Sequence, residues 1–237
     1  MARRVGLITG ASRGLGLALV RRLAARGWSL VIDARGRDAL DAARAELDDP
    51  ASVTAIAGDI AEEAHRRALI AAVGERGRLD ALVNNASLLG PSPQPPLADY
   101  PLDVLERVYS VNVFAPIRLI QLALPLLGSS RGRILNVTSD AGVEGYEGWG
   151  GYGSSKAALE QVSNVLAAER PDLKVYWVDP GDMNTQMHQE AYPGEDISDR
   201  RPPDDSVPGL LRLLEGDLPS GRYRARDIAP GRTEGPS

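Results

Sequence analysis

The sequence predicts a single-domain α/β fold: a doubly wound parallel sheet of about seven strands with helices on both faces. Short apolar runs alternate with segments of helical periodicity along the chain, which is typical of βαβ units. The runs at 80–83 and 132–137 lack polar–apolar alternation, as expected of strands covered by helices on both faces. Glycine-rich or polar segments follow several of these runs, where open parallel sheets bind their ligands.

In chain order, we expect strands over residues 4–9, 28–33, 52–57, 80–83, 132–137, 173–178 and 222–225, and helices over 14–26, 37–48, 61–76, 103–127, 153–169 and 205–214. The domain covers residues 1–228, and residues 229–237 are expected to be a frayed tail. Two long irregular segments, the proline-rich 88–102 and the polar 182–203, leave strand ends that carry candidate site residues. We therefore favour substrate-binding walls over disorder for both loops, with a short helix near 185–191.

The first strand leads into a glycine-rich turn, Gly10-Ala-Ser-Arg-Gly14-Leu-Gly16, and then into a helix that ends near Gly27. A strand, a glycine turn and a helix N-terminus together form an anion site, because free N–H groups and the helix dipole meet a phosphate there. The alternative is an ordinary connection between a strand and a helix. The strand before and the helix after the turn favour the anion site.

Lys156 follows Tyr152 by four residues, one helical turn, which places the hydroxyl and the ammonium on the same helix face. Lysine is scarce, with only Lys156 and Lys174 among 27 basic residues, so its use here is informative. A neighbouring cation favours the phenolate and is expected to lower the pKa of Tyr152, making it a proton donor or acceptor near neutral pH. The alternative is a surface tyrosine with an unrelated lysine one turn later.

With these motifs the chain resembles the short-chain dehydrogenase/reductase family, in its compact single-domain branch. Five segments carry the resemblance: the glycine turn from Thr9, Asp59-Ile60, Asn84-Asn85-Ala86-Ser87, the series Asn112, Ser139, Tyr152 and Lys156, and Pro180-Gly181 with Thr185. Ser87 replaces the last glycine of the family's Asn-Asn-Ala-Gly segment. The resemblance implies a Rossmann fold and hydride transfer between a nicotinamide cofactor and a carbonyl or alcohol substrate.

The resemblance also implies roles for residues of this chain. The catalytic residues are expected to be Asn112, Ser139, Tyr152 and Lys156. The cofactor-binding residues are expected to be Gly10, Ser12, Arg13, Gly14, Leu15, Gly16, Arg35, Asp59, Ile60, Asn85, Ala86, Tyr152, Lys156, Pro180, Gly181, Met183 and Thr185.

Tyr152 would protonate the carbonyl oxygen, Lys156 would bind the nicotinamide ribose, and Ser139 would stabilise the developing negative charge. Asn112 is a poor helix former inside helix 103–127, and Pro116 cannot donate a hydrogen bond to its carbonyl. We therefore expect a helix distortion at Asn112 that supports a water near Lys156. A simply satisfied buried asparagine is the alternative.

The second strand ends in Asp33-Ala34-Arg35, which decides the cofactor. A carboxylate on the ribose diol selects NAD, whereas an arginine accommodates the additional phosphate of NADP. By resemblance, NAD-binding members carry Asp at the position of Ala34, and NADP-binding members carry Arg at that of Arg35. Asp33 would reach the ribose only after a one-residue shift, and strand alternation points it away. NADP(H) is favoured over NAD(H).

The substrate pocket is expected to involve Asp140, Val143, Glu144, Glu147 and Trp149, together with residues after Gly181. Glu144 and Glu147 could meet a cationic or hydroxylated substrate, but a solvated loop is the account that we favour for them.

Composition excludes several other classes of protein. A net charge of −5 argues against a nucleic-acid surface, and the lack of cysteine excludes disulfides and thiolate sites. His65 and His188 share no metal-ligand spacing, and His65 lies in a polar helix start where we expect it to be solvated. We expect no metal, no membrane span, no signal peptide and a cytoplasmic protein.

By resemblance, the chain forms a homodimer or homotetramer through helices 103–127 and 153–169, although their apolar stripes could equally face the sheet. The preferred activity is NADP(H)-dependent interconversion of a ketone or aldehyde and an alcohol, with reduction favoured. The alternatives are an NAD-dependent alcohol dehydrogenase of the same family, a nucleotide-sugar epimerase or dehydratase on a related fold, and a non-catalytic dinucleotide-binding sensor.

Overall fold

A computed structural model describes residues 3–229, in which seven strands form one parallel sheet. The strands are β1 (Val5–Ile8), β2 (Ser29–Ala34), β3 (Val53–Ala57), β4 (Ala81–Asn84), β5 (Arg133–Val137), β6 (Lys174–Asp179) and β7 (Gly221–Arg224), in the order β3-β2-β1-β4-β5-β6-β7. Every strand lies within one residue of its predicted bounds. The chain reverses its winding between β1 and β4, and the crevice above this switch point is where doubly wound sheets bind ligands.

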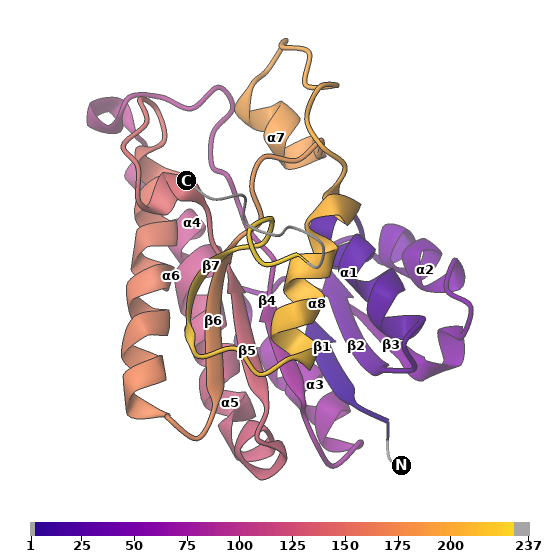
Figure 1. Ribbon diagram of the computed structural model, residues 1–237. Helices are drawn as coiled ribbons and strands as arrows, with labels where there is room; N and C mark the ends of the chain where they lie inside the picture. The colour runs from indigo at the N-terminus through magenta and orange to yellow at the C-terminus, as the bar shows by residue number, and fades with distance from the viewer. Residues whose placement is uncertain (1–2, 230–237) are drawn as a thin grey trace, which may run out of the picture.

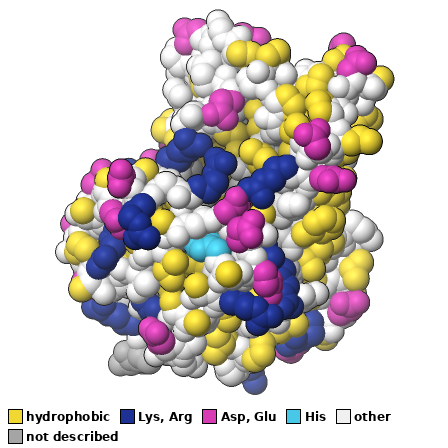
Figure 2. Space-filling view, turned by 180° about the vertical axis from the view of Figure 1, so that it is seen from behind, with side chains coloured by type: hydrophobic (Ala, Val, Ile, Leu, Met, Phe, Trp, Pro, Cys, Tyr) yellow, Lys and Arg dark blue, Asp and Glu magenta, His cyan; other side chains and the backbone are white. Residues whose placement is uncertain are grey.

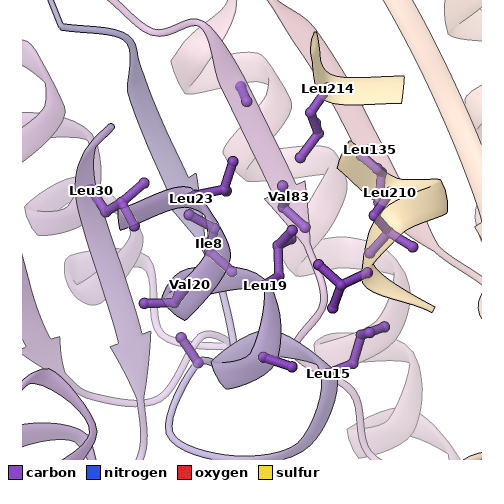
Figure 3. Close-up of a cluster of buried hydrophobic side chains, with 14 of the residues drawn as sticks. Ile8, Leu15, Leu19, Val20, Leu23, Leu30, Val83, Leu135, Leu210 and Leu214 are labelled. Atoms are coloured by element: carbon purple, nitrogen blue, oxygen red, sulfur yellow. The ribbon is translucent and has the colours of Figure 1, made fainter. Parts of the chain in front are cut away.

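Helices cover both faces of the sheet, as predicted (Figure 1). The helices are α1 (Gly14–Ala24), α2 (Arg37–Ala45), α3 (Glu63–Gly74), α4 (Leu102–Tyr109), α5 (Ala115–Ser130), α6 (Gly150–Glu169), α7 (Gln186–Ala191) and α8 (Val207–Glu215). Side chains of α1 and α8 pack with Ile8, Val83 and Leu135 on one face (Figure 3). On the other face, α3 and α5 pack on Leu7, Leu82 and Ile134. Alternate residues of each strand thus feed two separate cores.

The predicted helix 103–127 is interrupted. A π-helical turn, Ser110–Phe114, separates α4 from α5 and contains Asn112, followed by Pro116. Pro116 has no N–H to continue the regular ladder, and a single π turn, rare as such turns are, accommodates this break. The predicted distortion at Asn112 is confirmed.

Residues 102–130 also have the length and apolarity of a membrane span, with a mean hydropathy of 1.5 over their best 18 residues. Half of that window is buried in the fold, and Leu119, Ala123 and Leu127 lie fully buried on the sheet. This pattern is that of the core helix of a globular domain.

The prediction that His65 is solvated is wrong. Its ring is buried at the start of α3, and Nε2 lies 3.0 Å from Oδ2 of the buried Asp33. The surrounding residues are polar, but this position of the helix faces the sheet, where Asp33 supplies a hydrogen-bond partner.

The two long loops meet above the carboxyl ends of the strands. The short helix α7, predicted near 185–191, belongs to the segment that projects there (Figure 1). Ser92, in the proline-rich loop, donates a hydrogen bond to the carbonyl of Glu190 at the end of α7. Of the predicted tail, residues 230–237 lie outside the described residues, so its fraying stays a prediction.

Candidate active site

A cavity of about 1320 Å³ lies above the switch point of the sheet. It is lined by every residue predicted to bind cofactor or act in catalysis, except Gly16 and Asn112. These two lie directly behind the lining. The cavity exceeds the range of about 300–1,000 Å³ typical of small-ligand pockets, and so has room for a dinucleotide together with a substrate.

The glycine turn has a shape that larger residues would disturb. Gly10 and Gly14 have φ of +66° and +55°, in the left-handed region that favours glycine. A Cβ on Gly16 would lie 2.4 Å from the carbonyl oxygen of Gly10, so Gly16 is required for the close packing of the turn. Asn85 Nδ2 donates to the carbonyls of Thr9 (2.8 Å) and Gly10 (3.0 Å), which ties the turn to the end of β4.

The carboxylate of Asp33 is already engaged by the protein. Oδ1 accepts a hydrogen bond from the N–H of Gly10 at 2.9 Å, and Oδ2 faces His65. The side chain is almost fully buried, with 1 % exposed. Asp33 borders the cavity, but each of its oxygens already has a protein partner, through which it holds the glycine turn.

Arg35, by contrast, is exposed at the cavity and makes no ion pair or hydrogen bond with any residue between 3 and 229. The other cations nearby have partners: Arg13 is hydrogen-bonded to Gln186, and Arg107 is paired with Asp59. Burial alone would raise the pKa of Asp59, but the N–H of Ala61, the contact with Arg107 and the charge of Arg35 together lower it. Figure 2 shows basic side chains gathered below the projecting part of the molecule.

Tyr152, near the start of α6, is 8 % exposed and faces the cavity. Burial raises its pKa above the ordinary value, and the hydroxyls of Ser87 and Ser139 act in the opposite direction. The expectation that Lys156 makes the pKa of Tyr152 low is therefore not met in this state, because desolvation of the phenolate outweighs the favourable contacts. Tyr152 is protonated at neutral pH, the form that can donate a proton.

Ser139 caps the short helical turn after β5. Its Oγ donates to Asp140 Oδ1 at 3.0 Å and accepts from the N–H of Ala141 at 3.2 Å. The Ser139 hydroxyl must therefore rotate away from Asp140 before it can donate its proton in a hydrogen bond to a substrate oxygen.

Lys156 lies one turn after Tyr152 and is 2 % exposed. Nζ donates to the carbonyl of Val137 at 2.8 Å and lies 5.3 Å from the centroid of the Tyr152 ring. Burial lowers the pKa of Lys156 from 10.5 to about 8, an effect that Glu160 partly opposes. The protein thus holds a costly buried cation at the floor of the cavity.

Replacing Lys156 with Met is expected to stabilise the cofactor-free protein by about 2 kcal/mol at pH 7. The lowered pKa of Lys156 corresponds to a cost of about 3 kcal/mol for burying its ammonium, which the variant avoids. The variant also loses the hydrogen bond to Val137, which offsets about 1 kcal/mol of that gain. Because the pKa is lowered on folding, the cost is complete below pH 8 and disappears as the pH rises toward 10.5. Urea unfolding at pH 7 and pH 10 measures the difference between the two proteins, which should shrink at pH 10. A constant difference would contradict the buried charge as its cause.

Asn112 is 1 % exposed, and its carboxamide has partners on both sides. Nδ2 donates to the carbonyl of Leu88 and to Ser155 Oγ, both at 2.9 Å, and Oδ1 accepts from the N–H of Leu88 and from Ser87 Oγ. The Asn112 side chain is thus a fully hydrogen-bonded buried asparagine, which was the alternative expectation. Its backbone lies in a π turn, which was the expected helix distortion. Ser87 links this network to Tyr152.

The segment after β6 covers the glycine turn. Gly181 adopts φ of +78°, and Thr185 caps α7 by accepting the N–H of His188 at 3.2 Å. A Cβ on Gly14 would lie 3.6 Å from Thr185 Cγ2, so the two cofactor segments are in contact. Met183 packs against the core and pairs with Arg201.

On the substrate side, Asp140 and Trp149 line the cavity, whereas Val143, Glu144 and Glu147 are exposed outside its lining. The solvated loop is thus the better account of the two glutamates. Tyr192 and His188 also line the cavity, and sequence reasoning did not single them out. The one signal in the sequence for these two residues was that loop 182–203, which contains them, follows a predicted strand.

A family model described as short chain dehydrogenase matches residues 4–196. The chain belongs to the short-chain dehydrogenase family. Its sequence is 36 % identical over 196 residues to a benzil reductase ((S)-benzoin forming) of Saccharomyces cerevisiae, covering 79 % of this chain and 74 % of that one.

Solved structures of this family agree with the fold. One described as a short chain dehydrogenase from Pseudomonas syringae superposes with a TM-score of 0.88 at 33 % identity, covering 94 % of this chain and 95 % of that one. Another from Escherichia coli CFT073, complexed with NADPH, gives 0.87 at 30 % identity, covering 94 % and 96 %. This short-chain dehydrogenase is therefore an NAD(P)-dependent oxidoreductase with a Rossmann fold.

Proposed function

We propose that this short-chain dehydrogenase uses NADPH to reduce a ketone or aldehyde to an alcohol, with Tyr152 as the proton donor. The observation that carries the proposal is the protonated, buried Tyr152 in one cavity with Ser139, Lys156 and the glycine turn. The residues present suit a dinucleotide: the turn leaves room for a pyrophosphate, and Arg35 is a cation without a partner in the described chain.

When bound, the nicotinamide supplies the hydride that reduces the carbonyl carbon. Tyr152 gives its proton to the carbonyl oxygen as negative charge develops there. Ser139 turns its hydroxyl from Asp140 to the same oxygen and stabilises that charge. Lys156 binds the ribose hydroxyls and supplies a positive charge beneath the Tyr152 ring, which eases loss of the proton.

The proposed preference for NADPH rests on the contrast between Arg35 and Asp33. Arg35 has free donors at the cavity, whereas both oxygens of Asp33 are taken by Gly10 and His65. Guanidinium donors match phosphate geometry, and a ribose diol would find no free carboxylate at Asp33. The NADPH complex of the Escherichia coli relative supports the same preference.

The Arg35→Ala variant is expected to bind NADPH about 10–100-fold more weakly, the effect of losing about 1.5–3 kcal/mol of charge-assisted hydrogen bonds. NADH binding should change by less than about twofold, since that cofactor lacks the phosphate. Titration of each cofactor, followed by its fluorescence, measures both effects. Arg37→Ala is the matched control, because Arg37 is exposed nearby but does not line the cavity. Tighter binding of NADH by the wild type would instead favour the NAD-dependent alternative.

The proposal includes a cytoplasmic homodimer or homotetramer assembled through α5 and α6. Leu119 and Leu159 of the predicted stripes are buried in the subunit, but Phe114 (59 %) and Val165 (44 %) remain exposed on this side of the sheet. Exposed apolar residues on α6 and just before α5 suit contact with a second copy.

A further inference from the structure

We infer that the substrate carries an aromatic ring close to its carbonyl group, and that this ring packs on a wall formed by Trp149 and Tyr192. This inference rests on the proposed function and names the class of ketone that the same cavity accepts. We call these two residues the aromatic wall.

Aromatic side chains are concentrated at this one place. The chain has three Trp, seven Tyr and one Phe, and four of these, Tyr146, Trp149, Tyr152 and Tyr192, line the cavity. The core is built mainly from Leu, Val, Ile and Ala, and outside the cavity only Trp28, Tyr100 and Tyr176 among the described aromatic residues are buried in it. The position of four aromatic residues around the reacting tyrosine is therefore best explained by a ligand that binds to them.

The aromatic wall starts next to Tyr152, the proposed proton donor, and continues from Trp149 to Tyr192. The Trp149 ring lies 5.8 Å from the Tyr152 ring at an interplanar angle of 75°, and 5.9 Å from the Tyr192 ring at 48°. Tyr192 in turn lies 5.0 Å from His188, which is also at the cavity. The substituent of a carbonyl bound at Tyr152 can therefore reach these rings.

The wall comes from two segments far apart in the sequence. Trp149 immediately precedes α6, and Tyr192 immediately follows α7. Both rings are half-buried, so each keeps surface that a ligand can cover. Leu89 and Met187 add apolar lining, and the thioether of Met makes favourable contacts with aromatic rings.

Other substrate classes fit this surface less well. A sugar would leave the hydroxyls that lie against the ring faces of Trp149 and Tyr192 without hydrogen-bond partners there, although polar groups such as Asn184 line other parts of the cavity. A keto acid would bring its negative charge toward Asp140, whose carboxylate lies beside Ser139 at the reacting position. An uncharged aromatic ketone meets neither obstacle.

The test compares two ketones that differ only in the ring, 1-phenyl-2-propanone and 1-cyclohexyl-2-propanone, with saturating NADPH. Neither ring is conjugated with the carbonyl, so intrinsic reactivity is matched. The expected result is a kcat/KM about 10-fold higher for the phenyl compound, which corresponds to a ring–ring gain of about 1.4 kcal/mol. In Trp149→Leu and Tyr192→Leu the preference should fall below about threefold, mainly through loss of activity on the phenyl compound.

Tyr109→Leu is the matched control, because Tyr109 is a half-buried aromatic residue that does not line the cavity. It should keep the 10-fold preference. Equal kcat/KM for the two ketones in the wild type would overturn the aromatic assignment while leaving the proposed reductase activity in place. NADPH binding without turnover of either ketone, or of simple aldehydes, would overturn the proposed function itself.

Discussion

Replacing Tyr152 with Phe is expected to lower kcat for ketone reduction by about 10³-fold, within the range of about 10²–10⁴ for loss of a general acid. The variant keeps the ring and its contact with Trp149, and removes only the hydroxyl. The dissociation constant of NADPH should therefore change by less than about threefold. Steady-state assays and a fluorescence titration of the same preparation separate the two effects.

Tyr100→Phe provides the control for loss of a buried tyrosine hydroxyl. Tyr100 is 6 % exposed, its hydroxyl lacks a partner among the described residues, and it lies outside the cavity lining. This variant should retain full activity. A Tyr152→Phe enzyme with more than about 1 % of wild-type kcat would show that another group delivers the proton.

The raised pKa of Tyr152 predicts how the rate of each direction of the proposed reaction depends on pH. Reduction requires the protonated phenol, which burial preserves, whereas oxidation of an alcohol requires the phenolate. Reduction should accordingly be insensitive to pH near neutrality, and oxidation should rise as the pH is increased.

The sequence predicted the sheet and its helices well because each depends on local periodicity. Apolar runs of four to six residues, punctuated by glycine or polar segments, specify strands without knowledge of their partners. The π turn was also within reach, since Asn112 and Pro116 lie in one helix and their effect on its ladder is local.

The failures all depend on contacts between distant residues. His65 lies in a polar stretch, and its burial follows from Asp33, which is 32 residues away in the chain. The pKa of Tyr152 depends mainly on burial by the surrounding segments, which outweighs the opposing hydrogen bonds of Ser87 and Ser139. Tyr192 reaches the cavity only through the path of a long loop. Helix and strand patterns carry no information about such pairings.

The second large effect is expected from the buried pair that the sequence missed. Asp33→Ala should lower the free energy of unfolding by about 3 kcal/mol, because it leaves the N–H of Gly10 and the His65 ring without their buried partner. It should also weaken NADPH and NADH binding together, by about tenfold or more, since the carboxylate holds the turn that both cofactors share. Urea unfolding and the two cofactor titrations measure these changes.

His65 extends this link to the other side of the cofactor site. Its ring packs so closely on Gly58 that a Cβ there would lie 2.3 Å from Nδ1, and Asp59 and Ile60 follow directly. One carboxylate thus positions both the glycine turn and the segment expected to contact the adenine. Asp33→Asn, which keeps an acceptor for Gly10 and a polar group toward His65, should lose only about 1 kcal/mol. Loss of NADH binding alone in either variant would instead place Asp33 on the ribose and support the NAD-dependent alternative.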